Sequence, residues 1–307
     1  MISKEEFFSI CNTIIPQNEI DLYNKKTKRM WITLTLVLMI ELILAIVLSV
    51  CWSIVIIPII LAVFAVSVVI IFSTMKYSWH NFKSKYSAQV FDCLLKGYKH
   101  NFHQSAYIHQ SIFDKSGFAR NYDTYTGEDL LTIDIPKDDG TPSGIKLSIS
   151  DLFVTRKEQR TTIKNGKYYT ETRTVIVYKG AFAYVNFPFK FKCGIGLNIG
   201  FSGQKQIKLE DIEFNKKFKT YTNNQLEALV ILTPTLITKL LALSQKAGRF
   251  QLSITPYGEL YFGMKNNLFR LKGGKPSPQT FEDFYDDISI ILAIINEIKD
   301  NNKVFKM

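Results

Sequence analysis

Two sets of acidic residues have the side chains needed for acid–base chemistry. Glu128 and Asp129 are neighbours in the sequence, and four acids gather at positions 282–287 near the C-terminus. Paired carboxylates can exchange protons with a substrate. Acids at the start of a helix also interact favourably with the positive end of its dipole, which is a structural role. An enzyme with carboxylate acid–base groups is therefore an alternative function, and the sequence assigns none of these acids a catalytic role.

Motifs for metal, nucleotide or nucleophilic chemistry are lacking. His100, His103 and His109 have no carboxylate or thiol in register for a metal site. The glycines of 194–200 depart from the dinucleotide-binding spacing, and Gly273-Gly274-Lys275 lacks the earlier glycine of a phosphate loop. The four cysteines are widely scattered, which favours a reducing compartment over a disulfide framework. We predict no catalytic residue, no cofactor and no metal site.

The chain that must position these residues has one dominant feature, the apolar stretch of residues 31–75. Glu41 is its single charged residue. As a helix the stretch would be roughly 68 Å long, about twice the ~30 Å hydrocarbon core of a bilayer. One span does not fit that length, whereas two spans of about 20 residues do. We predict a transmembrane helical hairpin over residues 31–75 that turns around Ser49–Ser53.

Basic residues flank both ends of this stretch, whereas the predicted turn is uncharged. Because cytoplasmic loops carry the excess of Lys and Arg, both flanks are expected on the cytosolic side. The predicted location is the cell membrane, as a multi-pass protein with both termini cytoplasmic. The flanking residues are Lys25, Lys26, Lys28 and Arg29 before the stretch and Lys76, Lys83 and Lys85 after it.

Glu41 is expected near the middle of the bilayer, where an ionised carboxylate is costly. One interpretation is a proton or ion relay in a small transporter or channel component. The other is a neutral carboxylic acid hydrogen-bonded to Ser67, at comparable depth in the second span, or to a neighbouring subunit. No acidic or basic residue lies at similar depth, which favours the structural interpretation.

The net charge of +11 lies entirely on residues 76–307, and 151–192 is especially basic. Within that segment Asn165-Gly166 is typical of a tight β-hairpin turn. A basic domain tethered beneath an anionic leaflet is attracted to it, which argues against nucleic acid as the partner. A solvated hairpin protected by its charges is the structural alternative. The candidate contacts for anionic lipid headgroups or an unknown protein partner are Lys76, Lys83, Lys85, Arg156, Lys157, Arg160, Lys164 and Lys167.

Four regions are expected along the chain. A cytosolic amphipathic helix begins at the capping box Ser3–Glu6 and is followed by the basic flank. After the hairpin, a juxtamembrane helix continues to about Phe102. The remainder is a cytosolic α+β domain, a mostly antiparallel sheet with flanking helices and a C-terminal helix. The regions are 1–30, 31–75, 76–110 and 111–307.

Within the domain, alternating and β-branched runs predict strands, and capped apolar runs predict helices. Helices are expected to begin at Asn224 and again at Thr233, which precedes a proline, and the last is expected from about Phe281. The predicted strands are Leu130–Ile135, Ile145–Val154, Tyr168–Tyr178, Ala181–Phe191, Gly194–Phe201, Phe250–Ile254 and Leu260–Met264.

Three blocks of sequence resemble one family. They are SGFARNYDTYTGEDL at 116–130, VYKGAFAYVNF at 177–187 and EFNKKFKTYTNNQLEALVILTPTLITKLLAL at 213–243. Together they resemble an uncharacterised bacterial membrane family, the domain of unknown function numbered 3137. The resemblance implies two N-terminal apolar spans and a cytosolic α+β domain, and it carries over no catalytic or binding residue.

The function expected from the sequence is a membrane-anchored cytosolic interaction module. It would bind a partner protein or an anionic lipid surface. The alternatives are the membrane-associated carboxylate enzyme and, third, the transporter or channel component that uses Glu41.

Overall fold

The structure is a computed structural model, and it describes residues 3–15, 17–51, 56–137, 140–164, 167–265, 267 and 278–304. The chain divides into two compact units. The first contains residues 3–93 and is helical, and the second contains residues 94–265 together with the C-terminal helix. The two units are described separately below.

The helical unit consists of α1 (Lys4–Ile14), α2 (Gln17–Cys51) and α3 (Ile56–Leu94). The amide N–H of Glu6 donates to Ser3 Oγ at 3.2 Å, so the predicted cap of the first helix is confirmed. Phe7 and Cys11 form the buried face of α1.

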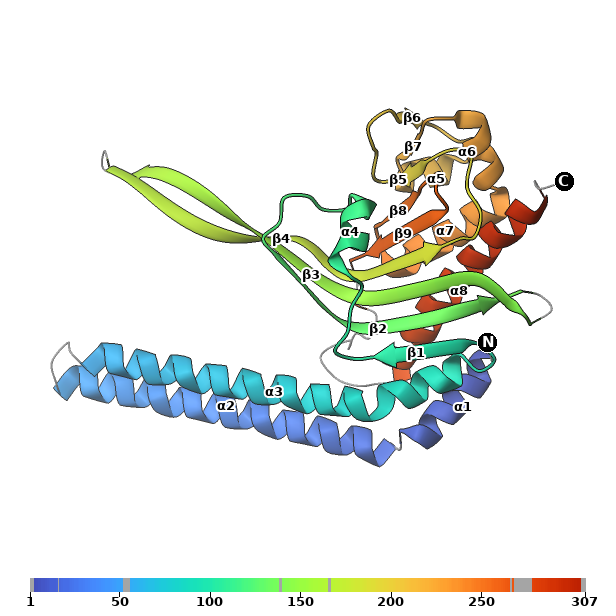
Figure 1. The fold of residues 1–307 in the computed structure, drawn as a ribbon. Coiled ribbons are helices and arrows are strands. Elements are labelled where there is room, and N and C mark those ends of the chain that lie inside the picture. The colour runs from blue at the N-terminus through green and yellow to red at the C-terminus, as the bar shows by residue number, and fades with distance from the viewer. Residues whose placement is uncertain are drawn as a thin grey trace. The chain divides into compact units, whose positions relative to one another are not determined.

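The two long helices α2 and α3 lie side by side in opposite directions (Figure 1). Near the start of α2, Glu19 accepts from Lys85 of α3 at 2.8 Å. Further along, the rings of Trp31 and Phe72 meet edge to face with centroids 6.4 Å apart. The predicted pair of helices is thus confirmed as a helical hairpin, with α2 beginning earlier than expected. Part of its predicted turn, Trp52 and Ser53, lies outside the described residues.

No single helix in the described part of the chain is both long and apolar enough to meet a length-and-composition test for crossing a membrane. The pair Gln225–Ile231 and Pro234–Lys246, bent by 72°, meets that test jointly.

In the second unit the described strands form one antiparallel nine-stranded sheet, in the order β1-β2-β3-β4-β9-β8-β5-β7-β6. From β1 to β4 neighbouring strands also follow one another along the chain. Short connections join β2 to β3 and β3 to β4, whereas the connection from β1 to β2 contains α4. The strands are β1 Lys99–His103, β2 Thr124–Pro136, β3 Pro142–Lys164, β4 Lys167–Asn186, β5 Ile195–Leu197, β6 Lys205–Ile207, β7 Thr220–Thr222, β8 Phe250–Ile254 and β9 Glu259–Met264.

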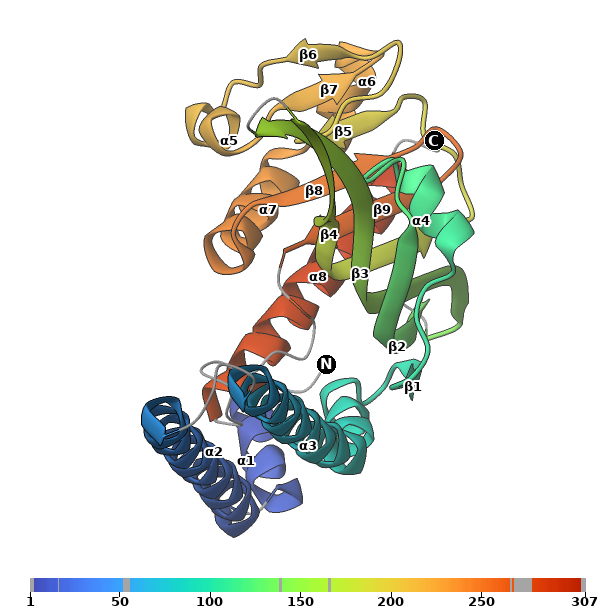
Figure 2. The same cartoon turned by 90° about the vertical axis from the view of Figure 1, so that its left-hand side faces the viewer.

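Helices cover both faces of this sheet (Figures 1 and 2). On one face α4 packs its Phe113 against Phe182 and Tyr178, with ring centroids 5.1 and 5.3 Å apart. On the other face lie α7 and α8, linked by an ion pair between Lys239 and Glu297 at 2.6 Å. The helices are α4 Gln110–Ser116, α5 Ile212–Lys217, α6 Gln225–Ile231, α7 Pro234–Ala247 and α8 Pro278–Val304. The predicted α+β class with a C-terminal helix is confirmed.

The expected continuation of the juxtamembrane helix to Phe102 is wrong. α3 ends at Leu94, and β1 pairs with β2 in place of the last predicted turns. Gly97, with φ of +90°, adopts a conformation that terminates a helix and favours glycine.

Two of the predicted strands, Tyr168–Tyr178 and Ala181–Phe191, form a single strand, β4, which ends at Asn186. Gly180 lies between them with φ of +139° and bends the strand without ending it. The predicted strand Gly194–Phe201 is shorter, because Asn198 has φ of +57° and stops β5 after Leu197. The remaining predicted strands and helices of the domain are confirmed, with shifted ends.

Candidate functional site

Strands β3 and β4 extend beyond the other strands of the sheet as a two-stranded arm (Figure 1). β2 pairs with β3 only as far as Thr155, and β9 pairs with β4 only from Phe182 onward. Residues 156–175, called the arm below, therefore pair only with one another among the described residues. The predicted hairpin is confirmed by the pairing of Lys164 with Lys167, although Asn165-Gly166 lies outside the described residues.

The arm carries several of the basic residues predicted as contacts. Arg156 forms an ion pair with Glu158, and the amide N–H of Lys157 donates to the carboxylate of Asp123 at 2.6 Å. Arg160 is exposed near the middle of the arm. Lys164 and Lys167 lie at the end of the arm, and their side chains fall outside the description.

The remaining predicted contacts lie on α3. Lys85 is exposed and pairs with Glu19 of α2. Lys76 and Lys83 belong to the same helix, and their side chains are outside the described set. The α3 lysines belong to the helical unit and the arm residues to the sheet unit. Their role as contacts stays a prediction.

Two tyrosines near the end of the arm are strongly exposed. Tyr168 is 76% exposed and Tyr169 is 51% exposed. As neighbours on one strand they point to opposite faces, so each face of the arm presents one of the two rings. By the strand register Arg160 lies on the face of Tyr169, and Lys157 lies on the face of Tyr168. Tyrosine has an apolar ring and a polar hydroxyl, a combination enriched at membrane–water interfaces.

Glu41 receives a hydrogen bond across the helical hairpin. Ser67 Oγ of α3 donates to Glu41 Oε1 of α2 at 3.0 Å. The predicted contact between these two residues is confirmed. Glu41 Oε2 is buried and has no hydrogen-bond partner among the described residues.

The acids considered for catalysis do not converge on the cavity described below. Glu128 is exposed, whereas its neighbour Asp129 is fully buried at a bulge between β2 and β3. Asp286 of α8 pairs with Lys246 of α7. Of the three histidines considered as metal ligands, His109 has a structural role. Its ring accepts a hydrogen bond from the amide N–H of Ser111 and caps α4. Within the described ranges, no cluster of three or more His, Cys, Asp or Glu could hold a metal ion.

A cavity of about 720 Å³ opens where β4 leaves β9. Before Gly180, β4 follows β3 into the arm, whereas β8 and β9 remain paired as far as Phe250 and Met264. The sheet therefore forks, and the cavity occupies the fork. A Cβ atom at Gly180 would lie 2.1 Å from the carbonyl oxygen of Met264, so only glycine fits at the point of the fork.

Aromatic side chains form the inner wall of the cavity. Phe118 follows α4, Tyr178 comes from β4 and Phe250 begins β8. The Tyr178 hydroxyl donates to the carbonyl oxygen of Ala181 at 2.7 Å. Burial, and then the nearby charge of Asp151, raise the pKa of Tyr178 far above its usual value. The hydroxyl thus stays neutral and holds the bend of β4 in place.

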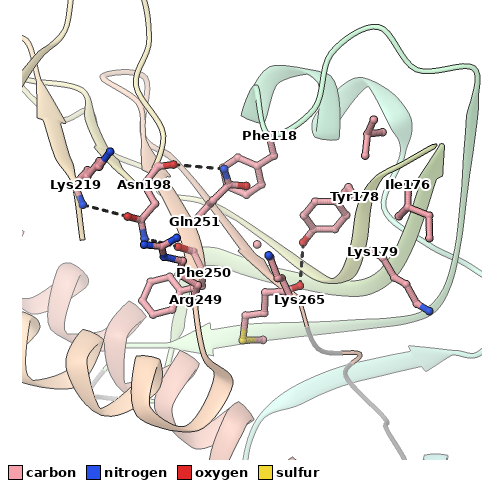
Figure 3. A pocket seen from close by; sticks show the side chains of 13 residues that line it. Phe118, Ile176, Tyr178, Lys179, Asn198, Lys219, Arg249, Phe250, Gln251 and Lys265 are labelled. Carbon is pink, nitrogen blue, oxygen red and sulfur yellow. Dashed lines mark hydrogen bonds between the residues drawn. The ribbon is translucent and has the colours of Figure 1, made fainter. Parts of the chain in front are cut away.

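Four cationic residues, and no acid among the described residues, line this cavity. Lys219 and Arg249 lie on one side of it and Lys179 on the other, with Lys265 between them (Figure 3). All four side chains are exposed, and none has a carboxylate partner within the described ranges. Lys179 Nζ lies 6.0 Å from the ring centre of Phe153.

Asn198 connects the segments that carry Lys219, just before β7, and Arg249, just before β8. Its Nδ2 donates to the carbonyl oxygen of Phe250 at 2.9 Å, and its Oδ1 accepts from the amide N–H of Lys219 at 3.1 Å (Figure 3). Sequence reasoning did not find this site. The cations come from four separated positions, and only the fold of the sheet brings them together.

Comparison with known proteins gives one match. Residues 172–299 match the family model DUF3137, described as a protein of unknown function. The resemblance to this family is thereby confirmed over that segment. The DUF3137 segment contains β5–β9 and α5–α7, and it contains every cavity-lining residue except Phe118. No curated protein and no solved structure matches the chain.

Proposed function

We propose that the chain is a membrane-anchored module whose α2–α3 hairpin lies in the bilayer and whose arm contacts anionic lipid headgroups. One observation carries the proposal, the apolar side chains exposed along both long helices. On α2, Leu36, Met39 and Ile43 are each more than half exposed, and on α3 the same holds for Val69 and Phe72. Water penalises an apolar surface of this extent, whereas a bilayer accommodates it.

The basic residues beside the apolar stretch support an orientation. Lys25, Lys26, Lys28 and Arg29 precede Trp31, and Lys76 follows the stretch. Because the excess of Lys and Arg marks the cytoplasmic side, this distribution favours both flanks, and hence the sheet unit, in the cytosol of the cell. The exposed ring of Trp31 is in the position expected for an interfacial anchor.

The arm supports the lipid contact by its charge and its tyrosines. Each Lys or Arg close to an anionic leaflet contributes about 1 kcal/mol of attraction. Lys157 and Arg160 are exposed on the arm, and Tyr168 and Tyr169 are exposed near its end. These side chains suit an anionic interface, where the cations meet headgroups and the rings enter the boundary region.

The lipid contact is tested with the full chain in proteoliposomes by limited chymotrypsin digestion. Cleavage after Tyr168 and Tyr169 reports the arm, and cleavage after Tyr257, which is 75% exposed, is the internal reference. Vesicles of phosphatidylcholine are compared with vesicles that also contain phosphatidylglycerol. The proposal predicts that anionic lipid slows cleavage of the arm relative to Tyr257. An equal ratio in the two kinds of vesicle would remove the lipid contact.

A matched pair of variants tests whether the arm's own charges are responsible. Lys157→Gln with Arg160→Gln removes roughly 2 kcal/mol of attraction, or about 30-fold in binding, and should abolish the protection. Lys205→Gln with Lys208→Gln removes two exposed cations elsewhere in the sheet unit and should preserve it. Loss of protection in both variants would assign the effect to net charge and not to the arm.

The two free edges of the arm favour a second candidate, a protein partner. Both strands of residues 156–175 leave backbone groups unpaired along their outer edges among the described residues. Such edges can accept an added strand from another chain. Protection of the arm in neutral vesicles only when a second protein is present would favour this candidate over the lipid contact.

A further inference from the structure

We propose that the cavity at the fork of the sheet binds a small ligand bearing two or more phosphate groups. The inference concerns the sheet unit alone and does not depend on the membrane anchor or on the arm. At about 720 Å³ the cavity has the volume of a small-molecule site.

The charge of the lining selects the chemistry of the ligand. Lys219, Arg249 and Lys265 come from separate positions in the sequence, and the fold brings all three to one cavity. Within the described ranges they have no carboxylate partner, so their charges repel one another with no neutralising group. Lys179 adds a fourth cation at the opposite side. A ligand with a single negative charge would leave most of this charge unbalanced, whereas a diphosphate or larger group would neutralise it.

The geometry of the cations suits phosphate oxygens. The guanidinium of Arg249 presents a planar set of donors that can bind two oxygens of one phosphate, and the lysines act as point charges. Asn198 fixes the backbone at Lys219 and at Phe250, next to Arg249, through its two side-chain hydrogen bonds. The backbone at the two cations is therefore held before any ligand arrives, which lowers part of the entropic cost of binding.

Contacts of Phe118 and Tyr178 at the fork keep the cavity open in the folded protein. At Gly263, a Cβ atom would lie 2.7 Å from the ring of Phe118. The ring consequently packs directly on the backbone of β9 and forms a rigid wall beside Tyr178. The hydroxyl of Tyr178, bonded to Ala181, holds the bend of β4 that separates it from β9.

Isothermal titration calorimetry on the full chain in nonionic detergent tests the site. The probes are pyrophosphate, ADP and soluble inositol trisphosphate, with orthophosphate as the single-phosphate reference. The expected result is saturable binding of at least one multiphosphate probe, at least about tenfold tighter than orthophosphate. If ADP binds more tightly than inositol trisphosphate, the ligand is a free nucleotide. If inositol trisphosphate binds more tightly, the ligand is a lipid headgroup. Binding of all three probes no tighter than orthophosphate would overturn the proposal.

Matched variants locate the binding. Lys219→Gln and Arg249→Gln replace exposed side chains, and circular dichroism checks that each variant keeps its fold. Each should weaken the best probe at least about tenfold, because each removes a charged hydrogen-bonding group. Lys205→Gln with Lys208→Gln, outside the cavity lining, should change its affinity less than about twofold. Equal losses in the two sets would show diffuse charge attraction and would overturn the assignment to the cavity.

Discussion

Replacing Gly180 by alanine should open the fork of the sheet. An added Cβ would lie 2.1 Å from the carbonyl oxygen of Met264 and 2.7 Å from the carbonyl carbon of Lys265. These are backbone atoms of β9 and its continuation, so they cannot move away as a flexible side chain would. A backbone shift of this kind costs about 1–3 kcal/mol. The φ of +139°, which alanine disfavours, adds about 1–3 kcal/mol.

Gly203 provides the matched control. Its φ is +81°, and a Cβ there has no neighbour within 4 Å among the atoms described. Gly203→Ala should therefore cost only the conformational penalty, about 1 kcal/mol. The expected loss for Gly180→Ala is about 3 kcal/mol or more. The difference between the two variants reports the close approach of β4 to β9 together with the greater backbone strain at Gly180.

The assay is urea unfolding of the full chain in detergent, followed by near-ultraviolet circular dichroism in the tyrosine band. All three tryptophans lie within residues 31–79, so tryptophan fluorescence does not report the sheet. Tyr178 and Tyr261 are buried in the sheet unit and supply the signal. Equal losses of stability in the two variants would refute the argument that the chains meet at Gly180.

Three further predictions each concern one residue: Glu41, Tyr178 and Cys11. In the helical hairpin, Glu41→Leu removes the hydrogen bond from Ser67 and should lower stability by about 0.6–2 kcal/mol, whereas Glu41→Gln retains an acceptor and should stay within about 0.5 kcal/mol. Thermal unfolding in detergent, followed by tryptophan fluorescence, measures the stability of both variants. A larger loss of stability in Glu41→Gln than in Glu41→Leu would contradict a structural role of Glu41. Burial raises the pKa of Tyr178, so the unfolded chain releases its proton from about pH 10 while the folded chain keeps it. The free energy of unfolding should therefore fall as the pH rises above about 10, by up to about 1.4 kcal/mol per pH unit. Urea unfolding of Tyr178→Phe should show a weaker dependence on pH. An unchanged dependence would contradict a raised pKa at Tyr178. Burial likewise raises the pKa of Cys11 to about 12, so at pH 8 N-ethylmaleimide should modify it only after unfolding, and rapid native labelling seen by mass spectrometry would disagree.

Much of the fold could be predicted from local patterns. The capping serine at position 3, the Thr233-Pro234 restart and the Asn165-Gly166 turn signal each depend on neighbouring residues, and the elements beside them form as expected. The pairing of Glu41 with Ser67 could also be predicted, because an antiparallel helical hairpin places positions at equal depth together.

The sequence was less informative where backbone conformation decides the outcome. Gly180 separates two β-branched and aromatic runs, and glycine occurs both in turns and at bends within strands. The pairing of Gly180 with Leu152 of β3, and of β4 with β9 from Phe182 onward, keeps the chain extended there. Similarly, Leu94, Tyr98 and Phe102 continue the four-residue spacing of a helix, whereas the chain from Lys99 onward forms β1 and pairs with β2.

The cavity could not be predicted from any single segment. Its cations, Lys179, Lys219, Arg249 and Lys265, lie in sequence contexts that resemble ordinary exposed positions. Only the strand order, which places β8 between β9 and β5, brings them to one fork. The acids at 282–287 were candidates for acid–base chemistry because they are close together in the sequence, yet none of them lines the cavity.

A bilayer hairpin with both flanks in the cytosol can be tested by cysteine labelling in bacterial spheroplasts. In a chain whose native cysteines are replaced by alanine, single cysteines are introduced at Leu22, at Ser53 and at Lys208. A membrane-impermeant maleimide should label Ser53→Cys in intact spheroplasts, and it should label Leu22→Cys and Lys208→Cys only after the membrane is permeabilised. Labelling of Leu22→Cys or Lys208→Cys in intact spheroplasts, or recovery of the chain outside the membrane fraction, would contradict the claim.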